Sequence, residues 1–249
     1  MKELMLLIAK ASYFPTRYSK DDEQLLWPRA LRLLPIWGLL AGVIMMGSVN
    51  ILHVLGLAAA ASCLLAIDVL FGCGIYLKDI INFADGIAPR MDKPQSTTTT
   101  LSETKVRIGY PGMIAAMAFL LLKYGVYYQF IKYNEIGIIA SSLPAAFVFS
   151  RWVYVWLVYD FATWGTNFLH QSFRREDFRF ASIITMVIMF IMASSFLWPT
   201  LIISLIAVYC WAMIRKKQGG MYQACYGAIS AWSEVLFLVV FIFFQWFIT

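Results

Sequence analysis

Residues 227–248, GAISAWSEVLFLVVFIFFQWFI, form an unbroken apolar block that contains one ionisable side chain, Glu234. A helix of roughly 20 apolar residues, rising about 1.5 Å per residue, is long enough to cross the hydrocarbon core of a bilayer. A soluble core of the same composition would instead show apolar stripes at helical or strand period. The block therefore predicts a transmembrane helix.

Similar blocks recur along the chain of 249 residues, of which 61% are hydrophobic and 14% are charged. An ordinary soluble domain has roughly 45–50% apolar and about 25% charged residues. We therefore predict an all-α, polytopic integral membrane bundle, one domain over residues 1–249 with about seven transmembrane helices. The fifth and sixth are expected to meet in a tight hairpin at Pro199. The expected spans are Leu33–Ile51, Val54–Gly72, Gly109–Ile131, Ile136–Leu157, Phe180–Trp198, Thr200–Ile214 and Gly227–Ile248.

The distribution of basic residues predicts the orientation of the bundle. Of the 20 Lys and Arg, 17 lie before the first span or in the loops 73–108, 158–179 and 215–226, whereas only Lys132 lies in the opposite loops. Cytoplasmic loops carry such an excess. We therefore expect a cytoplasmic N-terminus in the cell (inner or plasma) membrane, with the lipid bilayer as a partner. The net charge of +6 forms no single patch, so we expect no nucleic-acid partner.

Four ionisable side chains fall inside the expected spans: Asp68, Lys123, Arg151 and Glu234. A charge in the hydrocarbon region costs several kcal/mol unless it is paired or hydrated, so these residues are candidates for a functional site. The alternative is that they form buried ion pairs that only fix the packing of the helices.

The segment 73–108 is the one long connection with a pattern of its own. Its first part, CGIYLKDIINFADGI, has the apolar spacing of a helix and places Lys78, Asn82 and Asp85 along one face. We expect this face to bind a phosphorylated or anionic substrate at the cytoplasmic surface. The further residues expected there are Arg17, Lys105 and Arg107, and Gly219 and Gly220, whose backbone can approach a phosphate. The alternatives are solvated charges that orient the protein and an ordinary flexible turn.

Six short strings follow one another along the chain. They are SYFPTRY (12–18), GIYLKDIINFADGI (74–87), VRIGYPG (106–112), LLLKYG (120–125), FSRW (149–152) and GGMYQACYGA (219–228), followed by Glu234. In the same order they resemble F-L-T-R-L-P, G-L-H-L-D-G-L-A-D-T-A-D-G-L, the end of K-D-S-R-V-G-A-Y-G, L-L-L-K, L-S-R-W and G-G-x-T-G-D-x-x-G-A with a later glutamate. These are the strings of the cobalamin synthase family, the adenosylcobinamide-GDP ribazoletransferases.

The chain departs from the family pattern mainly at acidic positions. Lys78, Asn82, Lys105 and Ala224 stand where the family has aspartates, Tyr76 stands for a histidine, and Asp85 is the acid that stays in register. By this resemblance the catalytic residues are Asp85, Arg107 and Lys123, and Asp85 is the metal ligand. The substrate-binding residues are Arg17, Lys78, Asn82, Lys105, Arg151, Gly219, Gly220 and Glu234.

The resemblance implies a transferase that joins α-ribazole or its phosphate to adenosylcobinamide-GDP and releases GMP, with Mg²⁺ as the cofactor. A phosphorylated corrinoid or nucleotide would be the small-molecule partner. The replaced aspartates leave open a non-catalytic paralogue that binds a corrinoid or nucleotide or serves as a scaffold, as a homo-oligomer or beside an active relative. A small transporter or channel is a third class, but the sequence shows no inverted repeat.

Overall fold

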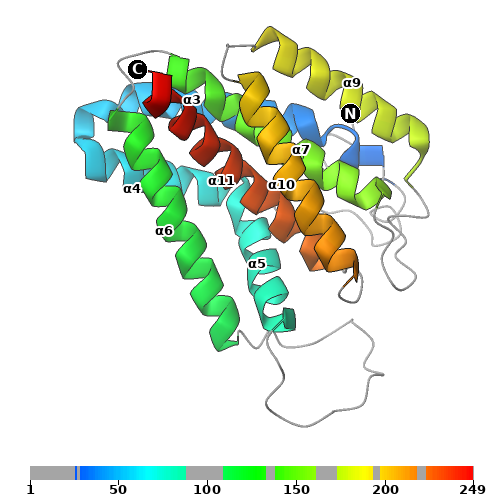
Figure 1. Cartoon of the computed structure of the whole chain (residues 1–249). Helices are drawn as coiled ribbons and strands as arrows, with labels where there is room; N and C mark the ends of the chain where they lie inside the picture. The colour runs from blue at the N-terminus through cyan, green and yellow to red at the C-terminus, as the bar shows by residue number, and fades with distance from the viewer. Residues whose placement is uncertain are drawn as a thin grey trace.

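The computed structural model describes residues 26, 29–87, 109–132, 138–160, 173–192, 197–217 and 223–248. In these ranges the chain forms helices and no strand, as the sequence predicts. Figure 1 shows long helices packed side by side. The α-helices are α3 (Leu34–Leu52), α4 (Leu57–Asp68), α5 (Gly74–Ile87), α6 (Tyr110–Lys132), α7 (Ile138–Asp160), α9 (Arg175–Ile191), α10 (Leu197–Lys217) and α11 (Gln223–Ile248).

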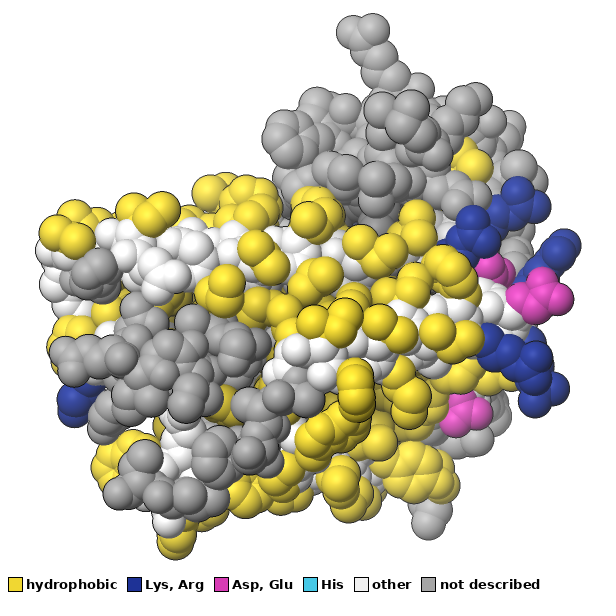
Figure 2. Space-filling view, turned by 90° about the horizontal axis from the view of Figure 1, so that it is seen from above, with side chains coloured by type: hydrophobic (Ala, Val, Ile, Leu, Met, Phe, Trp, Pro, Cys, Tyr) yellow, Lys and Arg dark blue, Asp and Glu magenta, His cyan; other side chains and the backbone are white. Residues whose placement is uncertain are grey.

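Four of these helices, α3, α6, α10 and α11, are long and apolar enough to cross a membrane, and the bent pair α4 and α5 would make a fifth span. Large apolar side chains such as Met117, Leu121, Ile206 and Phe247 are exposed on them. Figure 2 shows hydrophobic side chains over much of one face, whereas charged side chains gather near one end. This surface is that of a multi-pass membrane protein, because a monomeric soluble protein rarely exposes so large an apolar area.

The second expected span, Val54–Gly72, differs from the structure at both ends. Gly56, with φ +84°, separates a short 3₁₀ turn from α4, so the α-helix begins at Leu57. After Asp68 the chain passes through one π-helical turn, η2 (Val69–Cys73), and bends by 84° into α5. A π turn interrupts the regular i→i−4 hydrogen bonds, and such breaks are a recognised cause of sharp kinks. The expected straight span is therefore a bent pair.

The expected hairpin at Pro199 is also wrong. Pro199 lies in the first turn of α10, which runs from Leu197 to Lys217 rather than from Thr200 to Ile214. Proline is tolerated there because its missing N–H would have no partner within the helix. The preceding helix α9 is shifted toward the N-terminus relative to the expected span Phe180–Trp198, since it begins at Arg175 and ends at Ile191.

Two glycines bring α3 and α7 into close contact. A Cβ on Gly38 would lie 2.7 Å from the carbonyl oxygen of Phe147, and one on Gly42 would lie 3.0 Å from the backbone nitrogen of Pro144. The residues are four apart in the string GLLAG (38–42), so they share one helix face. This small-xxx-small spacing allows helix backbones to approach in a membrane, and the sequence interpretation above did not use it.

Candidate functional site

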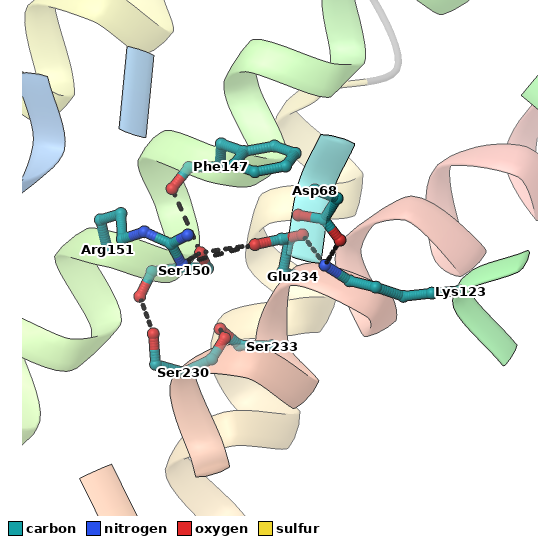
Figure 3. A network of polar contacts seen from close by, with 8 residues as sticks. All are labelled: Asp68, Lys123, Phe147, Ser150, Arg151, Ser230, Ser233 and Glu234. Atoms are coloured by element: carbon teal, nitrogen blue, oxygen red, sulfur yellow. Dashed lines mark hydrogen bonds and ion pairs between the residues drawn. The ribbon is translucent and has the colours of Figure 1, made fainter. Parts of the chain in front are cut away.

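A cluster of buried charges lies in the middle of the bundle (Figure 3). The Lys123 ammonium, on α6, lies 2.5 Å from Asp68 Oδ2, on α4, and 2.6 Å from Glu234 Oε1, on α11. All three residues are at most 2% exposed. The aromatic rings of Phe119 and Phe147 lie within 5.6 Å of the ammonium nitrogen. Lys123 is thus shared by two carboxylates inside an apolar shell.

Arg151, on α7, completes the cluster on the other side of Glu234. Its Nη1 lies 3.5 Å from Glu234 Oε2 and donates a hydrogen bond of 3.0 Å to the hydroxyl of Ser150. The guanidinium also lies 4.3 Å from the ring centre of Tyr76, on α5. The Ser230 hydroxyl donates a 2.6 Å hydrogen bond to the carbonyl oxygen of Ser150, which adds a second link between α7 and α11.

The cluster contains two acids and two bases, so with all four ionised its formal charges cancel. The four side chains come from α4, α6, α7 and α11, which are distant in the sequence. The packing of these helices brings together all four ionisable residues that the sequence places inside the expected spans. Neutralisation within the cluster makes this many buried charges tolerable in a membrane. The geometry therefore supports a role in holding the helices together. A catalytic role of Lys123 and a role of Arg151 and Glu234 in binding substrate stay predictions.

Asp85 makes a different kind of contact, near the end of α5. Its Oδ2 accepts a 2.8 Å hydrogen bond from the backbone N–H of Gly109, and its Oδ1 accepts a 2.7 Å bond from that of Gly112. Gly112 precedes Lys123 by about three turns of α6, or roughly 16 Å along the axis. Asp85 and the buried cluster therefore lie at two separate places in the bundle.

The helix α5 turns Asp79 rather than Lys78 toward the bundle. Lys78 is exposed, whereas Asp79 is partly buried, and its carboxylate occupies the space where a Cβ on Gly227 of α11 would stand. Tyr76, Ile80 and other apolar residues of α5 face the same interior. The interior acid of α5 is therefore one residue away from the position that the family pattern indicates, and only the packing of α5 against α11 reveals it.

We predict that Gly227→Ala weakens the packing of α5 against α11, because the new methyl group would overlap the Asp79 carboxylate. Overpacking of this kind costs about 1–3 kcal/mol. The thermal unfolding midpoint of the purified protein in detergent should fall, and Asp79→Ala in the same chain should restore most of the loss. A matched control is Gly125→Ala, since nothing lies within 4 Å of a Cβ at Gly125. Equal midpoints for Gly227→Ala and Gly125→Ala would contradict this packing.

The remaining predicted site residues lie outside the described part of the chain. Among those that are described, Asn82 and Asp85 are partly buried and follow Lys78 along α5, as the expected face requires. The structure thus tests the helical spacing of that face, but its contact with a substrate stays a prediction. The residues outside the described ranges are Arg17, Lys105, Arg107, Gly219 and Gly220.

The described residues do not fit the magnesium site that the resemblance implies. Mg²⁺ requires near-octahedral oxygen ligands and usually takes one or two carboxylates together with phosphates and waters. Both oxygens of Asp85 already accept backbone N–H groups, and Asp68 and Glu234 share the ammonium of Lys123. Within the described ranges, no group of three or more His, Cys, Asp or Glu is placed to hold a metal ion. The assignment of Asp85 as a metal ligand is therefore not supported by this geometry.

Comparison with known families gives a match that covers nearly the whole chain. The cobalamin-5-phosphate synthase family matches residues 3–242, a range that includes α5, α6 and the entire buried charge cluster. Comparisons with curated proteins and with solved structures give no match. The family is generally metal-dependent and acts in cobalamin biosynthesis. The chain therefore belongs to the cobalamin-5-phosphate synthase family.

Proposed function

We propose that the protein is an adenosylcobinamide-GDP ribazoletransferase of the cell (inner or plasma) membrane. It would join α-ribazole or its phosphate to adenosylcobinamide-GDP and release GMP. The observation that carries this proposal is the family match over residues 3–242, because it spans the membrane helices and the connections between them. A chain that had kept only the general character of a membrane bundle would not match a family over such a length.

The residues proposed to meet the substrate include a lysine of α5 and basic residues of the segment that precedes α6 in the sequence. Lys78 is exposed on α5 and can approach a diphosphate from solvent. Lys105 and Arg107 precede α6 in the sequence. The other members of the proposed set are Arg17, Asn82, Arg151, Gly219, Gly220 and Glu234. The cations would bind the diphosphate, and no step of the reaction is assigned to a metal.

A non-catalytic corrinoid- or nucleotide-binding paralogue is the second candidate, as a homo-oligomer or beside an active relative. The observation that favours it is the chemistry of the residues at the acidic positions. Lys78 and Asn82 stand in α5 where the family has aspartates, and both oxygens of Asp85 accept backbone hydrogen bonds. A chain with this set could still bind a diphosphate through its lysine and arginine side chains.

The experiment that separates the two is transfer from adenosylcobinamide-GDP to α-ribazole phosphate by the purified protein in liposomes with magnesium. Formation of the joined product and GMP supports the transferase, and binding of adenosylcobinamide-GDP without product supports the binding protein. If the protein forms no product and does not bind adenosylcobinamide-GDP, both candidates are refuted. The liposomes contain no other protein, so any product must be formed by this protein and not by an active relative.

We predict that Lys78→Met weakens the binding of adenosylcobinamide-GDP by about fivefold, in line with the loss of one solvent-exposed ion pair. The dissociation constant measured in liposomes is the readout. Lys132→Met is the matched control, because Lys132 is an exposed lysine at the far end of α6. An unchanged dissociation constant for Lys78→Met would remove Lys78 from the proposed site.

A further inference from the structure

The first turn of α6 has few ways to satisfy its backbone donors. An α-helix leaves its first N–H groups without partners inside the helix. In α6 these belong to Gly109, directly before the helix, to Tyr110 and to Gly112, whereas Pro111 has no N–H. None of the side chains at these positions is a Ser, Thr, Asp or Asn that could cap the helix locally. These four positions therefore supply no side-chain cap of their own.

Asp85 supplies this cap from the preceding helix. It lies 24 residues before Gly109 in the sequence, and its two oxygens separately accept the N–H groups of Gly109 and Gly112. A carboxylate beside a helix N-terminus also interacts favourably with the positive end of the helix dipole. The contact ties α5 to α6 across the intervening segment 88–108, so the two ends of that segment are held together.

The two glycines are part of the same contact. A Cβ on Gly112 would lie 2.7 Å from Asp85 Oδ2, and a Cβ on Gly109 would overlap the carboxylate. Glycine is therefore required at both positions because an acid occupies the space of the missing side chains. Without that acid, an alanine at Gly112 would meet no such obstacle.

We propose that Asp85 is a positioning residue that caps α6 from α5, and that it is not a metal ligand. The two bonds occupy one lone pair on each oxygen and fix the carboxylate over backbone amides, whose hydrogens exclude a cation from that side. The inference is independent of the proposed function, since the cap forms whether or not the protein transfers a nucleotide.

A double-mutant cycle tests the cap in detergent with EDTA present. Asp85→Ala and Gly112→Ala should each lower the thermal unfolding midpoint, the first by removing the acceptor and the second by displacing it. In the Asp85→Ala background, Gly112→Ala should no longer lower the midpoint and should raise it slightly, because alanine is the better helix former. Gly125→Ala, with nothing within 4 Å of its Cβ, should behave alike in both backgrounds. A penalty for Gly112→Ala that is equal in both backgrounds would overturn the proposal.

Amide exchange and Mn²⁺ binding separate capping from metal ligation. With EDTA present, the backbone amides of residues 109–113 should exchange about tenfold faster in Asp85→Ala than in the wild type. Asp85→Asn keeps one acceptor oxygen, so its exchange rate should lie between those of the wild type and Asp85→Ala. Binding of Mn²⁺ to the wild type, followed by its electron paramagnetic resonance signal, should be unaffected by Asp85→Ala. Unchanged exchange together with loss of Mn²⁺ binding would show that Asp85 is a metal ligand after all.

Discussion

Replacing Lys123 by methionine is expected to be the most damaging single change in the described part of the chain. It would leave Asp68 and Glu234 in an apolar interior without the ammonium that lies within 2.6 Å of both carboxylates, and Arg151 would be the one remaining cation of the cluster. Removing one partner from a buried ion pair costs about 3–5 kcal/mol, a large share of the stability of an ordinary protein. We expect little folded protein in the membrane and a strongly lowered unfolding midpoint for what can be purified.

The control for this prediction lies on the same helix. Lys132 is exposed in the last turn of α6, so Lys132→Met removes the same charge and adds the same side chain at an exposed position. Its unfolding midpoint should stay close to that of the wild type. A midpoint for Lys123→Met equal to that of Lys132→Met would show that the buried cluster contributes nothing to stability.

A double variant keeps the prediction testable if Lys123→Met does not accumulate. Without Lys123 the cluster holds two carboxylates and one cation, Arg151, so adding Asp68→Asn restores the charge balance and leaves Glu234 beside Arg151. A buried charge without a partner is costly, whereas a balanced buried pair is tolerated. The double variant should therefore accumulate better than Lys123→Met, and an equal or lower yield would argue against charge imbalance as the cause.

The sequence predicts the members of the buried cluster but not its pairing. Ionisable side chains inside apolar blocks are conspicuous, and Asp68, Lys123, Arg151 and Glu234 can all be found in this way. Lys123 and Asp68 are 55 residues apart, and Arg151 and Glu234 are 83 apart, so their contacts depend on how the helices pack. Local periodicity carries no information about such packing, and the alternative pairings stay open until the structure is known.

The side of α5 that faces the bundle is a detail that the sequence does not predict. Helical spacing correctly predicts a helix after residue 73, but the π turn Val69–Cys73 and the bend that follows set which side of it faces the bundle. Asp79 consequently lies against Gly227, and Lys78 is exposed. A π turn leaves no clear signal in the sequence, so the one-residue difference between Lys78 and Asp79 could not be interpreted from spacing alone.

The prediction with the second largest expected effect concerns Gly42 at the contact between α3 and α7. Gly42→Ala would place a methyl group against the backbone of Pro144, 3.0 Å from its nitrogen atom. A flexible side chain could move away, but the backbone of a packed helix cannot do so without separating the two helices. Overpacking costs about 1–3 kcal/mol, so we expect a clear drop in the unfolding midpoint.

Gly47→Ala gives this prediction a control with the opposite sign. Gly47 lies in the same helix, and nothing lies within 4 Å of a Cβ there, so the substitution should stabilise the helix by up to about 1 kcal/mol through propensity alone. The two variants should therefore differ by about 1–4 kcal/mol. Equal midpoints would mean that α3 and α7 are not in close contact at Gly42.

The close approach at Gly38 connects this helix contact to the buried charges. A Cβ on Gly38 would lie 2.9 Å from Cγ of Arg151, whose guanidinium contacts Glu234 and Tyr76. Gly38→Ala should therefore displace the Arg151 side chain as well as separate the helices. Combined with Arg151→Ala, which removes Cγ and the rest of the side chain, the added loss from Gly38→Ala should shrink. An unchanged loss would place the obstruction at the carbonyl of Phe147 alone, and the helix contact would then be independent of the charge cluster.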